Sequence, residues 1–363
     1  MNLQSMLKIY AFDPLFFRDG KPFTMGNEHG ANGIFPPYPS VFYGALRTLY
    51  FSSRIELFQM LKKERKFNNP QDDPSRSLKI KGVFISVNDE PFFPLPLDCV
   101  EEEDSDNQEV MVLELKDNEF ISSNRLPKIL VPPTGETVEN VENGYFSIYE
   151  MEEYLNGKKK DKLPYVNLMD YTYKEEKIGI ARNYKTRHTQ EQMLYKISMT
   201  RMVPNLSILV DYEGLELPEK GVLRLGGEGK IASYETVKIP KIEAPKITSS
   251  CFKVYLATPA LFRNGWLPGW INGDESGEDR YQGNFNGVRI RLLAAAIGRY
   301  VSIGGFDMAR NYPKVMRRAV PAGSVYYFSA DCDENTIIDL FHGRNISDYR
   351  NEEGFGLAFV GRV

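Results

Sequence analysis

A stretch near the N-terminus of the chain recurs in its second half. Residues 7–20 and residues 252–265, which start 245 positions apart, align without a gap. Six positions are identical: Lys8/Lys253, Tyr10/Tyr255, Pro14/Pro259, Phe17/Phe262, Arg18/Arg263 and Gly20/Gly265. In-register matches that include Pro, Gly and Arg indicate an internal duplication, although two unrelated strands could also look alike. Each copy alternates like a β-strand and then enters a polar turn, so the sequence predicts two related modules that each open with a strand.

Length and composition restrict the classes of protein that this chain can represent. With 363 residues, it suits two domains of roughly 100–200 residues each. No apolar run approaches the ~18 residues of a membrane helix, and residues 1–10 lack the pattern of a signal peptide. The three cysteines, Cys99, Cys251 and Cys332, are too widely spaced for a disulfide framework or a zinc site. We therefore expect a cytoplasmic protein without a membrane partner, metal or cofactor.

The net charge of −4 hides two basic segments. Residues 177–201 contain six Lys or Arg and one acidic residue, Glu191, and residues 288–318 contain seven Lys or Arg and one acidic residue, Asp307. Outside them remain 32 of the 45 basic residues and 47 of the 49 acidic residues. Positive charge concentrated in this way is typical of a phosphate-binding face. Two solvated faces without a ligand are the alternative.

The first basic segment reads as a long β-hairpin. Two β-prone arms, residues 177–182 and 193–202, flank a polar tip that holds Lys185, Arg187 and His188, with Tyr184 and Tyr195 beside it. Cations interleaved with aromatic rings suit single-stranded RNA, because cations follow the backbone while rings stack on unpaired bases. An edge hairpin whose charges prevent pairing with other strands is the alternative.

Other segments add candidate sites. A helix is predicted from Pro39, with Arg47 either snorkelling from an apolar stripe or facing a phosphate. Gly226, Gly227 and Gly229 precede a strand. Their spacing does not fit the Walker motif, and they form either a tight turn or a loop that a phosphodiester approaches.

The remaining segments concern the organisation of the chain. Residues 289–300 suit a helix or a strand, and residues 304–318 form a basic loop. Residues 88–177 read as an insertion in the first module, and residues 241–250 as a linker.

These pieces together resemble the RAMP superfamily of CRISPR effector proteins. The resemblance is closest to the Cmr-type (type III-B) subunit that holds the 5′ end of the guide RNA. It rests on motifs spread over almost the whole chain, in residues 14–20, 39–48, 179–181 with 194–195, 225–230, 321–328 and 354–361. Each motif alone is weak, and their order and spacing make the resemblance specific.

The resemblance implies an α+β fold of two ferredoxin-like (RRM-like) domains in tandem, with a large insertion in the first. The domains would span residues 1–240, with the insertion at about 88–177, and residues 251–363. The implied function is that of a subunit binding the repeat-derived 5′ tag of the crRNA and docking to the large polymerase-like subunit and the backbone RAMP subunits. The RNA-contacting residues carried over from the family are Arg182, Lys185, Arg187, His188, Gly226, Gly227, Gly229, Gly354 and Gly356. Charge alone adds Arg18, Arg47, Arg310, Lys314 and Arg317, all expected to line one shared groove.

Some RAMP relatives cut precursor RNA, usually with a His that moves the 2′-OH proton. This chain has only His29, His188 and His342. His188 lies among cations, where a phosphate contact is as reasonable as catalysis, and His342 ends a short helix as a structural residue would. No paired acidic motif marks a nucleotide polymerase. We therefore expect a non-catalytic RNA-binding subunit. The alternatives are a metal-independent repeat-RNA endonuclease using His188 or His29, and a structural adaptor with an acidic partner.

Overall fold

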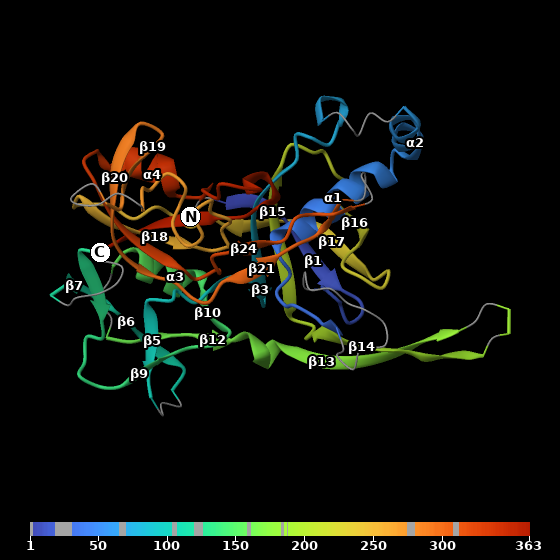
Figure 1. Cartoon of the computed structure of the whole chain (residues 1–363), viewed down its shortest axis with the longest axis horizontal. Coiled ribbons are helices and arrows are strands. Elements are labelled where there is room, and N and C mark those ends of the chain that lie inside the picture. The colour runs from blue at the N-terminus through green and yellow to red at the C-terminus, as the bar shows by residue number, and fades with distance from the viewer. Residues whose placement is uncertain are drawn as a thin grey trace.

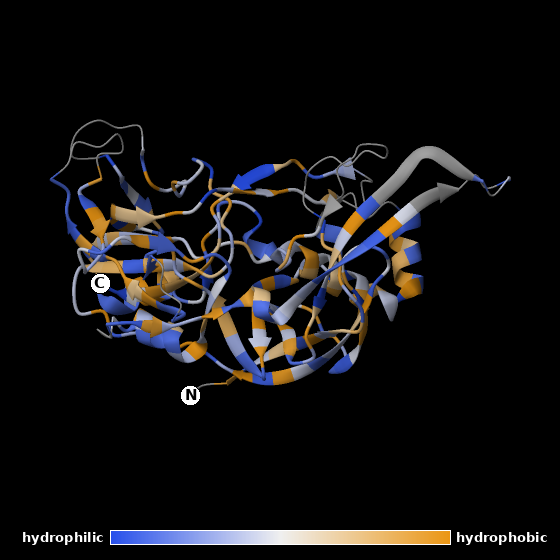
Figure 2. Ribbon diagram, turned by 90° about the horizontal axis from the view of Figure 1, so that it is seen from below, coloured by the Kyte–Doolittle hydropathy of each residue, from blue (hydrophilic) through white to orange (hydrophobic). Residues whose placement is uncertain are grey.

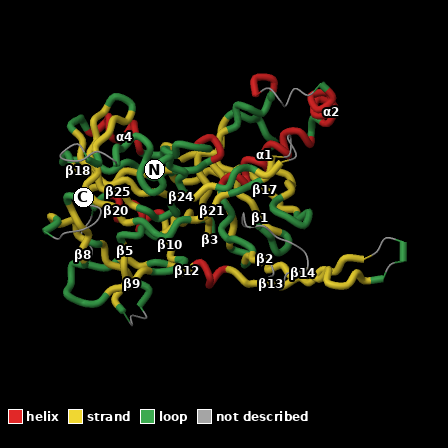
Figure 3. The backbone as a smooth tube through the Cα atoms, viewed as in Figure 1, coloured by secondary structure: helices red, strands yellow, loops and turns green. Residues whose placement is uncertain are grey.

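The computed structural model is an α+β protein dominated by β-strands (Figures 1 and 3). It describes residues 3–18, 31–64, 70–103, 107–119, 126–157, 161–182, 185–186, 188–273, 280–307 and 312–363. Four α-helices lie within these residues: α1 (Pro39–Ser52), α2 (Ile55–Lys63), α3 (Ile148–Leu155) and α4 (Glu334–Phe341). Short 3-10 turns are η2 (Pro70–Asp72), η3 (Leu168–Tyr171) and η4 (Asn351–Glu353).

An eight-stranded sheet forms the N-terminal half, in the order β12-β10-β4-β3-β15-β1-β17-β16. Its strands are β1 (Leu3–Ala11), β3 (Lys79–Val87), β4 (Glu90–Pro94), β10 (Gly144–Ser147), β12 (Val166–Asn167), β15 (Leu206–Glu213), β16 (Lys220–Arg224) and β17 (Ile231–Pro240). Helix α1, with Pro at its first position, packs one face of this sheet through Phe42, Ala45 and Leu46.

A six-stranded sheet forms the C-terminal half, in the order β19-β20-β25-β18-β27-β26. Its strands are β18 (Cys251–Leu256), β19 (Gln282–Phe285), β20 (Val288–Ala296), β25 (Val325–Ala330), β26 (Arg344–Asn345) and β27 (Leu357–Arg362). Helix α4 covers it through Ile337 and Phe341. Residues 288–296 are thus strand, because alternate residues of this segment reach the core while Arg289 and Arg291 stay exposed.

The two duplicated stretches occupy matching places. Strand β1 lies between β15 and β17, and β18 lies between β25 and β27, antiparallel to both neighbours in each case. Their shared lysines, Lys8 and Lys253, are both buried. Both lysines share a sheet face with apolar residues of the cluster between the halves: Met6 on β1 and Tyr255 on β18.

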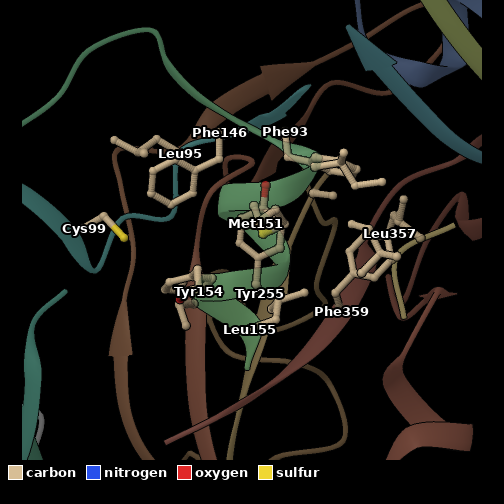
Figure 4. Packing of buried hydrophobic residues seen from close by; sticks show 14 of the residues in the cluster. Phe93, Leu95, Cys99, Phe146, Met151, Tyr154, Leu155, Tyr255, Leu357 and Phe359 are labelled. Atoms are coloured by element: carbon tan, nitrogen blue, oxygen red, sulfur yellow. The ribbon is translucent and has the colours of Figure 1, made fainter. Parts of the chain in front are cut away.

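The insertion packs against both halves of the molecule. Its residues 88–177 supply β4, β10 and β12 to the first sheet. They also form β5 (Cys99–Glu102), β6 (Glu109–Val112), β7 (Glu114–Asp117), β8 (Lys128–Val131), β9 (Val138–Asn140), β11 (Leu163–Pro164) and α3. Its Met151, Tyr154 and Leu155 from α3 join one core with Phe93 from the first sheet and Phe359 from the second (Figure 4). Helix α3 begins directly after β10, where Ser147 caps its N-terminus by accepting a hydrogen bond from the Tyr149 amide at 3.2 Å.

A buried polar cluster sits in this core. The Asp98 carboxylate accepts hydrogen bonds from the hydroxyls of Tyr154, at 2.8 Å, and Tyr327, at 2.6 Å. The Lys253 ammonium lies 3.4 Å from the centroid of the Tyr154 ring. Burial lowers the pKa of Lys253, and nearby Asp98 counteracts this by favouring the charged form. The cluster joins the insertion to the second sheet by polar bonds as well as by apolar packing.

Candidate nucleic-acid interface

A long hairpin projects from the body. It consists of β13 (Thr172–Arg182) and β14 (Thr189–Met202), paired from Thr172↔Met202 to Arg182↔Thr189. Its root is fixed because Leu15 and Thr200 exchange backbone hydrogen bonds of 2.8 Å, and because β14 pairs with β2 (Ala31–Asn32). Figure 1 shows β13 and β14 extending beyond the rest of the molecule, and Figure 2 shows from below where the two strands leave the body. The predicted hairpin is confirmed and is longer than its predicted arms.

Acidic partners neutralise the cations at the root of the hairpin. Lys196 Nζ lies 2.7 Å from Glu176 Oε1 across the two strands, and Arg201 pairs with Glu175 in the same way. The hydrogen bond from Arg201 lowers the pKa of Glu175. Lys177 pairs with Glu228 of the glycine-rich turn. These three ion pairs reduce the net positive charge of the root of the hairpin.

Of the four predicted RNA contacts of the hairpin, the structure describes the backbone of Arg182 and the side chains of Lys185 and His188. Arg182 is the last residue of β13, and Lys185 and His188 are exposed. Arg187 lies outside the described residues, as does the side chain of Arg182.

The predicted arginines of the N-terminal half differ in their surroundings. Arg18 is exposed and its backbone bridges to Gly33. Arg47 turns instead toward the loop before β3, where its Nε donates to Ser75 Oγ at 2.8 Å and its guanidinium pairs with Asp73. A phosphate at Arg47 would have to displace the Asp73 carboxylate, so this residue is better explained by its structural contacts.

The glycines of the two candidate loops are explained by close packing. Gly226 has φ +75°, and a Cβ there would lie 2.5 Å from the Phe16 carbonyl oxygen, to which the Gly227 amide donates at 2.8 Å. Gly229, with φ +68°, completes the turn. Gly354 and Gly356 also have positive φ, and added Cβ atoms would meet Ile80, Pro39 and Ser347. These turns hold backbone against backbone, so tight turns account for them without an RNA contact.

The second basic segment divides between the C-terminal sheet and a ribbon. We define the ribbon as residues 299–319, which contain the paired strands β21 (Val301–Ile303) with β24 (Arg317–Ala319) and β22 (Phe306–Asp307) with β23 (Tyr312–Pro313). Lys314 Nζ is 2.6 Å from Glu353 Oε1. Arg317 lies 3.9 Å from the Tyr349 ring centroid and Arg318 lies 4.6 Å from that of Tyr300. Arg310 lies outside the described residues.

Hairpin tip and ribbon do not form one compact patch. In Figure 1 the ribbon strands β21 and β24 cross the middle of the body, whereas the hairpin tip lies beyond its right-hand end. A ligand that touches both must therefore be extended, as a single strand of nucleic acid is. The single shared groove expected from the sequence is replaced by two separate basic elements.

The insertion has the opposite charge. Residues 88–177 contain 22 acidic and nine basic residues, so the remainder of the chain has an excess of basic residues. Its surface would repel a polyanion, which argues against an RNA contact on the insertion.

His342 has a structural environment. Its Nε2 contacts the Ile242 carbonyl at 3.2 Å, and its Nδ1 accepts from the Val360 amide at 3.4 Å. Burial lowers the pKa of His342 and so favours the neutral ring. Both ring nitrogens already have backbone partners. Among the described residues, no group of three or more His, Cys, Asp or Glu is arranged to hold a metal ion. The described helices also include none that is long and apolar enough to cross a membrane.

The fold is similar to that of a chain in a solved Type III-B Cmr-beta structure. A chain in the cryo-EM structure of the Type III-B Cmr-beta bound to cognate target RNA matches with a TM-score of 0.50 and 17% identity, over 93% of this chain and 88% of that chain. A second structure, of the Type III-B Cmr-beta bound to cognate target RNA and AMPPnP in state 1, gives a TM-score of 0.48 at 18% identity, over 93% and 88% of the two chains. No curated protein sequence matches.

The family itself is shown by sequence. The model of the family described as CRISPR-associated protein (Cas_Cmr3) matches residues 7–363. This chain therefore belongs to the Cas_Cmr3 family of CRISPR-associated proteins, in agreement with the resemblance seen in its motifs.

Proposed function

We propose that this protein is a non-catalytic RNA-binding subunit of a type III-B CRISPR effector complex. It holds the repeat-derived 5′ tag of the crRNA and docks to the large polymerase-like subunit and the backbone RAMP subunits. The observation that carries this proposal is the projecting hairpin with a basic tip, in a chain whose family model spans residues 7–363. A similar chain in a Type III-B Cmr-beta bound to RNA supports the same assignment.

The strand order supports two ferredoxin-like domains. In a βαββαβ unit the first strand lies between the third and fourth. The orders β17-β1-β15-β3 and β27-β18-β25-β20 both place the opening strand in this way. The first half keeps the helix after its opening strand, α1, and the second keeps the helix before its last strand, α4. Residues 1–240 and 251–363 would then be the domains, with a linker at 241–250.

Salt-dependent binding tests the hairpin assignment. The variant Arg182→Ala/Arg187→Ala should bind tagged single-stranded RNA more weakly, and its log-log salt slope should flatten by roughly 1.4, since each phosphate contact to a single strand contributes about 0.7. Lys196→Ala is the matched control, because this cation on the same hairpin is already paired with Glu176. Equal affinity and slope in the tip variant and the wild type would reject the assignment.

Incubation with labelled repeat RNA separates binding from cleavage. We expect intact RNA after incubation with the purified protein. Products that disappear in His188→Ala would establish the endonuclease alternative instead, with His188 exposed at the hairpin tip as its acid-base group. The other candidate, His29, lies outside the described residues.

A further inference from the structure

The ribbon exposes an unusual concentration of large apolar side chains. Tyr300, Phe306, Tyr312, Val315 and Met316 all lie in its residues 299–319, with Tyr300 51% and Tyr312 69% exposed. Soluble proteins gather such side chains on one surface chiefly where they bind something. Three of the five are aromatic rings, and the exposed arginines Arg317 and Arg318 follow directly after Met316 in the sequence.

The underside of the ribbon is firmly anchored, so this exposure does not result from loose packing. Ile303 and Ala319 are buried in a cluster with Leu261 and Phe355. Arg350 donates to the Gly304 carbonyl at 2.9 Å, and the Lys314–Glu353 ion pair fixes the far end. The ribbon therefore holds its exposed rings at defined positions.

The two arginines of β24 each lie over a tyrosine ring. The guanidinium carbon of Arg317 is 3.9 Å from the centroid of the Tyr349 ring, and that of Arg318 is 4.6 Å from the centroid of the Tyr300 ring. Within the described part of the chain neither guanidinium has a carboxylate within ion-pairing distance. A guanidinium that rests on a ring keeps its charge and offers a planar surface for a further stacked group.

We propose that the ribbon binds unpaired nucleobases of single-stranded RNA, which stack on Tyr300, Tyr312 and the guanidinium of Arg318. This inference rests on the proposed function and assigns different parts of the RNA to the two elements. The hairpin tip contacts phosphates, and the ribbon binds bases. Exposed rings beside arginines that lack a carboxylate partner are the combination used by single-strand binders, and every base offers a face to stack on. Lys314 plays no part in base binding, since Glu353 holds it.

Fluorescence of a base analogue tests the proposal with the full-length protein. The probe is a short single-stranded RNA with 2-aminopurine, whose emission falls when it stacks, and affinity is followed separately by anisotropy. The wild type should quench the probe. Tyr300→Ala/Tyr312→Ala should lose most of the quenching and bind about tenfold more weakly. The control Tyr149→Ala removes a ring of 56% exposure from α3 of the insertion and should behave as the wild type.

The outcomes separate this inference from the proposed function. The hairpin variant Arg182→Ala/Arg187→Ala should bind more weakly but quench fully at saturation, because its ribbon is intact. Wild-type quenching and affinity in the ribbon variant would overturn the inference and leave RNA binding standing. Loss of association with other complex subunits at unchanged RNA affinity would also overturn it, by marking the ribbon as a protein-docking surface. Absence of any RNA binding by the wild type would overturn both.

Discussion

Removing the Asp98 carboxylate should loosen the joint between the insertion and the second sheet. Asp98 has no exposed surface, and in Asp98→Ala the hydroxyls of Tyr154 and Tyr327 lose their acceptor while Lys253 loses its nearby negative charge. A hydrogen bond to a charged group contributes about 1.5–3 kcal/mol, and Asp98 accepts such bonds from two tyrosine hydroxyls. These contributions overlap within one cluster. We therefore expect a loss of about 3–5 kcal/mol in the free energy of unfolding.

Urea denaturation of single and double variants checks this value. Tyr327→Phe alone should cost about 1.5–3 kcal/mol, because Asp98 then lacks one donor. In the Asp98→Ala background the same substitution should cost almost nothing, since the hydroxyl has already lost its acceptor. Hydrogen exchange should rise first in α3 and β25, the elements that carry Tyr154 and Tyr327. A loss below about 1 kcal/mol for Asp98→Ala, or additive costs in the double variant, would refute this reasoning.

Three further predictions concern stability and are read out by chemical denaturation. Burial raises the pKa of Asp211 from 3.8 to about 6, so its stabilising contribution is present below about pH 4 and is lost as pH rises through 6. Asp211→Asn should therefore be more stable than the wild type by about 3 kcal/mol at pH 8 and equal to it below pH 4; a constant difference would contradict this. Gly226→Ala should cost roughly 1–3 kcal/mol, because of its φ of +75° and the 2.5 Å approach to the Phe16 oxygen; an unchanged midpoint would contradict it. Gly44→Ala should add about 0.5–1 kcal/mol, since Gly44 lies within α1 with open space around it; a loss would show an unseen contact.

Much of the fold could be predicted from local sequence patterns. The duplicated stretch predicts β1 and β18, whose alternation and following Pro are local signals, and the hairpin follows from its β-prone arms and polar tip. The role of the insertion could not be predicted in this way. Its apolar residues pack in one core with residues of both sheets. The spacing of apolar residues along the sequence predicts helices and strands, but not which distant elements they pack against.

The candidate site was predicted less completely than the fold. Counting charge within residues 177–201 omitted Glu175 and Glu176, which lie just before that segment and pair with its cations across the hairpin. A register drawn for the hairpin would have placed Glu175 and Glu176 beside Arg201 and Lys196. Arg47 pairs with Asp73, and Lys314 pairs with Glu353. Both acidic partners are more than 20 residues away along the chain, so no local sequence pattern indicates these ion pairs. Tyr349 is likewise separated from Arg317 by 32 residues, so their stacking appears only in three dimensions.

Photo-crosslinking maps the RNA on the protein most directly. A single-stranded RNA with the 5′ tag and photoreactive nucleotides would be irradiated with the full-length protein, and the linked peptides identified by mass spectrometry. We predict crosslinks in residues 182–188 at the hairpin tip and 299–319 in the ribbon, and none in the acidic insertion. Crosslinks that fall mainly within residues 88–170, with neither predicted segment linked, would contradict the account.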